Sequence, residues 1–137
     1  MSADGAGPKL RSTPIPATGY LIVRGEETDT DQLRQSAHRF LERYPGWHLF
    51  GVSGFYAPSE AAVAAICAEK LPMWEFITVY RVEDLLASGL DIEATGRTPH
   101  VTMLHADLDE LVERLTHSVH ERRQNPYHEI NSGRRNQ

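Results

Sequence analysis

Short apolar runs alternate with amphipathic stripes along the first half of the chain. Residues 20–23 (Tyr-Leu-Ile-Val) are strand formers in a run too short for a buried helix. Apolar residues then recur at helical spacing over residues 33–44, and Pro45-Gly46 ends that segment. Residues 47–56 predict a second strand. Residues 58–71 predict a helix that begins at Pro-Ser-Glu and ends before a proline.

The alternation continues in the second half. Residues 75–81 predict a strand with opposite faces at odd and even positions, and residues 82–89 predict a short helix ending at a glycine. Residues 99–105 predict a further strand, and residues 107–123 carry the clearest helical periodicity. This order favours an α+β single domain with a mixed sheet of about four strands and helices packed mainly on one face. The strands are not uniformly apolar, which disfavours a doubly wound parallel sheet.

The ends of the chain differ in composition from the middle. Residues 1–18 are rich in Gly and Pro and poor in large apolar side chains, so we predict a flexible leader there. We predict a globular domain over residues 19–125 and a C-terminal tail over residues 126–137. The sequence lacks both an apolar run of membrane-spanning length and the pattern of a secretory signal. A cytoplasmic location is therefore predicted, and the single cysteine, Cys67, fits a reducing compartment.

The charge balance limits the partners that the chain can bind. It has 14 Lys and Arg residues against 19 Asp and Glu, a formal net charge of −5. Tight binding to nucleic acid without regard to sequence depends on neutralising several phosphates with Lys and Arg. Only two lysines are present, Lys9 and Lys70, and this composition argues against a protein that coats duplexes. A nucleic-acid enzyme remains compatible with it if cationic groups converge locally.

The most suggestive motif is Pro-His-Val-Thr-Met-Leu over residues 99–104. Side chains two apart on a strand share a face, so His100 and Thr102 are expected to point the same way. Neutral imidazole can accept or donate a proton, and a hydroxyl can orient a phosphate oxygen. The pattern resembles one half-motif of the two-histidine phosphoesterases, which act on RNA ends and cyclic phosphodiesters. The resemblance implies His100 as acid/base and Thr102 as a phosphate-orienting residue.

In that family a second, similar motif faces the first across a cleft. The nearest candidate here begins at His48, on the strand predicted over residues 47–56. Phe50 stands where the hydroxyl is expected, and Ser53 has the wrong parity unless a bulge at Gly51 adds one residue to the strand. With that bulge, His48 becomes a second catalytic candidate. Without it, His48 is an ordinary half-buried residue beside aromatic neighbours.

Four residues are candidate substrate-binding groups. Arg24 and Arg81 directly follow predicted strands, and Arg97 lies just before the His100 motif. Tyr127 follows a proline, where it can either complete a pocket or dock the end of the chain. With these residues we predict a small phosphoester-processing enzyme acting on RNA or a nucleotide, with no cofactor. Its size is similar to that of the toxins of toxin–antitoxin pairs.

Three other interpretations stay open. His117 and His120 lie three apart on the last predicted helix, where a solvated face is favoured over a metal site. The strand-end arginines faintly resemble those of ADP-ribosyltransferase toxins, with Glu93 or Glu129 as the acid. The main alternative is a non-enzymatic acidic binding module, such as an antitoxin, immunity or adaptor protein, that docks a basic protein partner. Cys67 lies on an apolar stripe and is interpreted as a core residue.

Overall fold

The computed structural model describes residues 7–25 and 30–128. One six-stranded sheet forms its centre, with strand order β4-β5-β2-β1-β3-β6. Every neighbouring pair in it is antiparallel. The strands are β1 (Tyr20–Arg24), β2 (Phe50–Ala57), β3 (Phe76–Arg81), β4 (Asp91–Ala94), β5 (His100–His105) and β6 (Val119–Gln124). The α+β single domain is confirmed, whereas the expectation of a mixed sheet with about four strands is wrong.

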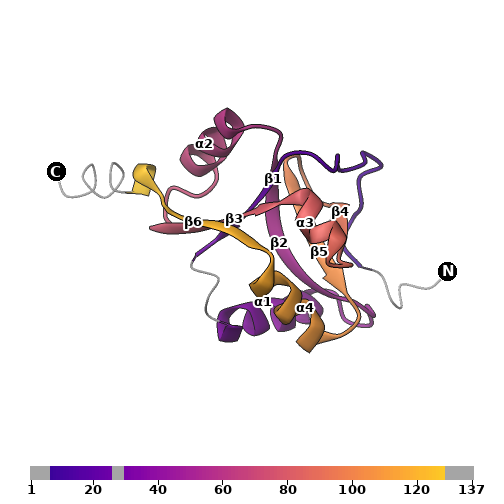
Figure 1. Ribbon diagram of the computed structural model, residues 1–137. Helices are drawn as coiled ribbons and strands as arrows, with labels where there is room; N and C mark the ends of the chain where they lie inside the picture. Colours follow the sequence, from indigo (N-terminus) through magenta and orange to yellow (C-terminus); the bar gives the residue numbers. More distant parts are fainter. Residues whose placement is uncertain (1–6, 26–29, 129–137) are drawn as a thin grey trace.

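Helices cover both faces of this sheet (Figure 1). The helices are α1 (Thr30–Arg43), α2 (Glu60–Glu69), α3 (Val82–Ala87) and α4 (Leu108–His117). Buried residues of α1, α3 and α4 belong to a core cluster on one face. Buried residues of α2 belong to a second cluster on the opposite face. The α2 face is only partly covered, and the candidate site lies on its uncovered part.

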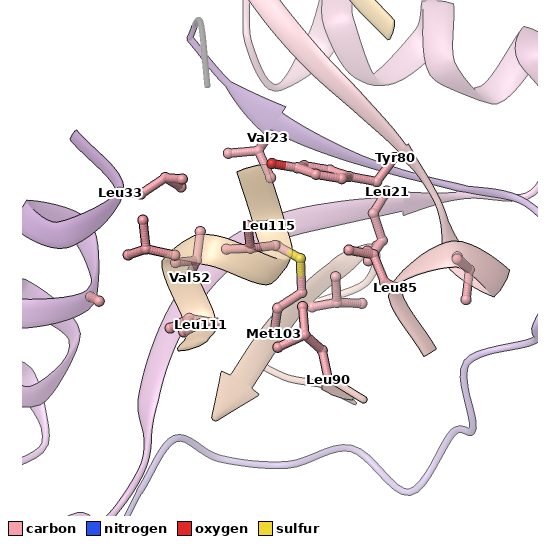
Figure 2. Close-up of a cluster of buried hydrophobic side chains, with 14 residues drawn as sticks. Leu21, Val23, Leu33, Val52, Tyr80, Leu85, Leu90, Met103, Leu111 and Leu115 are labelled. Carbon is pink, nitrogen blue, oxygen red and sulfur yellow. The ribbon is translucent and has the colours of Figure 1, made fainter. Parts of the chain in front are cut away.

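The larger core cluster fills the space between the sheet and the α1, α3 and α4 helices (Figure 2). Leu21 and Met103 from the sheet meet Leu111 and Leu115 from α4, and all four side chains are fully buried. The period-2 alternation of the strands explains this division of side chains. On β3, for example, Tyr80 faces this cluster while its neighbours at 77 and 79 face α2.

Several local signals act as the sequence predicts. Ser59 caps α2, and its hydroxyl accepts a hydrogen bond from the Ala62 N–H group at 3.2 Å. Gly89 follows α3 with a positive φ of 93°, the conformation expected after a helix end. Cys67 is buried in the α2 cluster, and burial raises the pKa of its thiol, in agreement with a core role.

The last predicted helix is wrong in its second half. The helix expected over residues 107–123 ends at His117, and residues 119–124 form β6 on the free edge of β3. Strand β4 was not predicted, because its four residues are few and only half apolar. Within the described residues no helix has the length and apolar character to cross a membrane.

Candidate functional site

The two residues of the His100 motif share one face of β5. His100 pairs with Phe55 of β2, and Thr102 pairs with Ser53. The pairing between β2 and β5 is regular from Phe50 to Phe55, so the bulge at Gly51 is not present. These four side chains consequently point to the sheet face that carries α2, while α4 lies on the other face. His100 and Thr102 are therefore not covered by the last helix.

A chain of hydrogen bonds fixes the His100 ring. Its Nδ1 atom lies 2.9 Å from the Thr95 hydroxyl and 3.2 Å from the Thr95 backbone oxygen. The Thr95 hydroxyl lies 2.7 Å from the hydroxyl of Thr102, and both threonines are buried. A carbonyl oxygen only accepts, so its bond to the ring requires a proton on Nδ1. In that tautomer Nε2 has a free lone pair and makes no hydrogen bond to any described residue.

The electrostatic environment keeps this imidazole neutral. Burial lowers the pKa of His100 below its ordinary value, and the positive charges of Arg11 and Arg43 lower it further. The hydrogen bond with the Thr95 backbone acts in the opposite direction but does not reverse the shift. His100 is therefore mainly neutral at pH 7, which is the form that accepts a proton.

A cavity of about 420 Å³ opens in front of His100. Its volume lies within the range of small-molecule sites, roughly 300–1,000 Å³. Hydroxyl groups on its wall come from Ser53, Thr95 and Thr102, and Phe40 and Tyr44 add aromatic surface. Gly51 makes the position of Phe40 possible, because a Cβ atom there would lie 2.9 Å from the Phe40 ring.

A second hollow of about 550 Å³ continues from the first along the sheet toward Trp74. The two share several wall residues, among them Phe40, Arg43, Lys70 and His100. We refer to both together as the groove. Six Lys and Arg residues line it: Lys9, Arg24, Arg39, Arg43, Lys70 and Arg97. None of its lining residues, all within the described part of the chain, is Asp or Glu.

The cations of the groove differ in ion pairing from three arginines elsewhere on the surface. Arg34, Arg114 and Arg123 form ion pairs with carboxylates elsewhere on the surface. The six groove cations form no ion pair with any residue in 7–25 or 30–128. Since no described side chain neutralises their charge and no described carboxylate lines the groove, this surface is positively charged within residues 7–25 and 30–128.

Part of the predicted leader contacts this site. Leu10 forms an isolated antiparallel bridge with Thr95, and the Arg11 N–H group donates to the Ala94 oxygen at 2.8 Å. The Nη1 atom of Arg11 donates to the backbone oxygens of Thr95 (2.7 Å), His100 (3.0 Å) and Gly96 (3.2 Å). Residues 9–11 therefore hold the loop between β4 and β5. The domain boundaries stay a prediction.

The predicted catalytic pair of histidines is not brought together. His48 precedes β2 and lies near Phe50, which pairs with His105 at the end of β5 farthest from His100. Five residues of strand separate these positions, or about 17 Å at the usual rise of ~3.4 Å. The His48 ring is exposed and packs against Trp47, with ring centroids 4.5 Å apart.

The four predicted substrate-binding residues do not all lie at one place either. Arg24 and Arg97 line the groove. Arg81 lies at the opposite end of β3 from the residue that pairs with Arg24, and it lines neither hollow. Tyr127 packs, half-buried, against the α2 core cluster and also lies outside the groove. The structure thus places two of the four at the candidate site.

Several site residues were missed by sequence reasoning. Thr95, Arg43 and Lys70 reach the site from a loop, the end of α1 and the end of α2. No local pattern connects them with His100. The sequence pointed to Ser53 only as a partner of His48, for which its position on the strand had the wrong parity. In the structure Ser53 pairs with Thr102.

The structure does not bring together the residues of the other two candidate sites. His117 ends α4 whereas His120 lies on β6, so the two do not share a helix face. The described residues contain no group of three His, Cys, Asp or Glu side chains able to hold a metal ion. Of the two acids named for an ADP-ribosyltransferase, Glu93 lines neither hollow and Glu129 lies outside the described residues. Comparison with protein-family models, curated proteins and solved structures found no match to this chain.

Proposed function

We propose that the protein is a phosphoester-processing enzyme that acts on RNA or a nucleotide, with His100 as its acid/base. One observation carries this proposal. A neutral histidine, whose Nε2 makes no hydrogen bond to a described residue, lines a hollow whose described wall has cations without ion pairs and no carboxylate. Such a wall attracts phosphate, and it places a proton acceptor beside the bound anion.

The proposed step moves one proton in each direction. His100 Nε2 accepts the proton of an attacking hydroxyl, either water or a ribose hydroxyl of the substrate, as its oxygen forms a bond to phosphorus. The ester bond to the leaving oxygen then breaks, and the imidazolium returns the proton to that oxygen. Arg43 and Lys70 offset the negative charge on the phosphoryl oxygens.

In this scheme the two buried threonines act through His100. Thr95 holds Nδ1, and Thr102 holds the Thr95 hydroxyl, so that both are positioning residues. This differs from the role expected for Thr102, since its hydroxyl is buried and bonded to Thr95. A Thr95→Val variant is expected to lower kcat and to shift the acid limb of the pH–rate profile, because the ring loses the hydroxyl contact at Nδ1 and keeps only the contact with the backbone oxygen of residue 95.

The direct test compares two histidine variants. His100→Ala should reduce turnover of oligoribonucleotides, dinucleotides or 2′,3′-cyclic nucleotides by about 10²- to 10⁴-fold, the usual contribution of an acid/base group. His48→Ala is the matched control, because His48 is exposed and about 17 Å away along the strand. Its turnover should equal that of the parent, and both variants should unfold near the parent temperature. Full activity in His100→Ala, or no turnover of any of these substrates by the parent, would overturn the proposal.

A further inference from the structure

The groove extends well beyond the surroundings of His100. Arg24 and Arg39 line only the part near Trp74, whereas Lys9 and Arg97 line only the part near His100. Arg24 is on β1 and His100 on β5, and these strands are separated by β2 alone. Two strand spacings amount to about 10 Å. The two groups of cations therefore line different parts of the groove and offer separate places for phosphates.

An aromatic surface ends the groove on the side away from His100. Trp74 is 39% exposed, and the guanidinium carbon of Arg24 lies 5.0 Å from the centre of its ring. The loop that carries Trp74 is held by buried Asn125, which donates to the oxygens of Leu71 (2.8 Å) and Trp74 (3.0 Å). A partly exposed indole on an anchored loop, with an arginine over its ring and further cations nearby, is a combination that binds bases and phosphates of a single strand.

From these observations we propose that the ligand of the groove is a single-stranded RNA segment, which lies along the groove from Trp74 to Arg97 with several phosphates on its cations. This inference rests on the proposed function, since it places the reacting phosphate at His100. It adds that recognition depends on nucleotides on the Trp74 side of that phosphate. A mononucleotide would occupy only the part in front of His100.

The charge outside the groove argues against a duplex. Without the six groove residues, eight of the 14 Lys and Arg remain against 19 Asp and Glu. A duplex presents phosphates over a broad surface and would meet this excess of carboxylates. The groove runs between the end of α1, with Arg39 and Arg43, and the end of α2, with Lys70. An extended strand therefore fits its charge distribution better than a double helix.

The binding experiment uses full-length His100→Ala protein, so that the probe is not consumed. Fluorescently labelled oligouridylates of two to twelve nucleotides are titrated by anisotropy at 50–200 mM salt. Contacts with three or four phosphates predict a log–log salt slope of about −2 to −3, at ~0.7 per phosphate. The Kd should then weaken about 16- to 64-fold across this range, and affinity should rise with length before reaching a plateau.

Two further substitutions in the same background locate the strand. Arg39→Ala should make the salt slope less steep by about 0.7, and Trp74→Ala should weaken binding about 5- to 150-fold through lost stacking. Arg81→Ala is the matched control: it removes one exposed arginine outside the groove and should change neither quantity.

The outcomes separate this inference from the proposed function. Affinity that does not depend on length, with an unchanged salt slope in Arg39→Ala and an unchanged affinity in Trp74→Ala, would overturn it, even where turnover of small substrates still requires His100. Binding of a duplex or of a poly-glutamate peptide as tightly as the single strand would also overturn it. Length-dependent binding with turnover that does not require His100 would instead refute the catalytic assignment.

Discussion

Arg11 supplies a test of how the site is held together. Its half-buried guanidinium donates from Nη1 to the oxygens of Thr95, Gly96 and His100. Two N–H groups serve these three acceptors, so the contact amounts to two hydrogen bonds from a charged donor. Such bonds contribute about 1.5–3 kcal/mol each when buried. Because Arg11 is partly exposed, Arg11→Ala should lower the free energy of unfolding by about 2 kcal/mol in total.

The same substitution should change the titration of His100. The positive charge of Arg11 lowers the pKa of His100, so its removal should raise that pKa toward the ordinary value. Urea unfolding followed by tryptophan fluorescence measures the first effect, and the imidazole NMR signal against pH measures the second. Arg34→Ala is the control, because its 2.6 Å ion pair with Asp109 is exposed and should contribute less than about 1 kcal/mol.

The reasoning fails if Arg11→Ala is as stable as Arg34→Ala and leaves the titration of His100 unchanged. Residues 9–11 would then rest on the loop without stabilising it. A loss of stability without a pKa change would confirm the hydrogen bonds but refute the electrostatic coupling between Arg11 and the ring.

Three further predictions concern the same face of the sheet. Gly51→Ala places a Cβ atom 2.9 Å from the Phe40 ring, so it should cost about 1–3 kcal/mol in a urea melt; unchanged stability would show that the ring moves freely. Asn125→Ala removes three side-chain hydrogen bonds, one buried and two partly buried, and should cost about 2–3 kcal/mol, with a shift of tryptophan emission as its second readout. The pKa of His100 is lowered in the folded state, so between pH 7 and the folded pKa the unfolded state binds more protons, and stability should fall as the pH falls. In His100→Gln this fall should be smaller, and an equal fall would contradict the assignment.

Local patterns predicted much of the fold and failed where pairing with a distant strand decides the structure. Residues 119–124 continue the sequence of α4 without a proline or glycine and are compatible with a helix. They form a strand because the edge of β3 has unpaired backbone groups, and five residues of β6 pair with it. Tertiary context of this kind overrides helix propensity, and a single sequence does not contain it.

The candidate site, like the fold, was predictable only where local sequence decides it. That His100 and Thr102 share a face follows from the two-residue period of any strand, and this part was predictable. The partner of the ring, Thr95, comes from the preceding loop, and its role depends on the turn between β4 and β5. The second histidine was expected from a resemblance that required a bulge at Gly51. The regular pairing of β2 with β5 shows that this bulge is absent.

Net charge is a poor guide to a local charged surface because it averages over the whole molecule. The sequence, at −5, disfavours a broad basic face, and the fold agrees, since six of the 14 Lys and Arg residues line one groove. Helices α1 and α2 pack on opposite faces of the sheet, yet Arg43 at the end of α1 and Lys70 just after α2 line the same groove, although they are 27 positions apart in the chain. In the proposed function, the excess of acidic residues elsewhere would favour binding along the groove, because carboxylates repel phosphate chains. Affinity for the groove should therefore fall with added salt, while repulsion by the remaining surface limits binding to other sites.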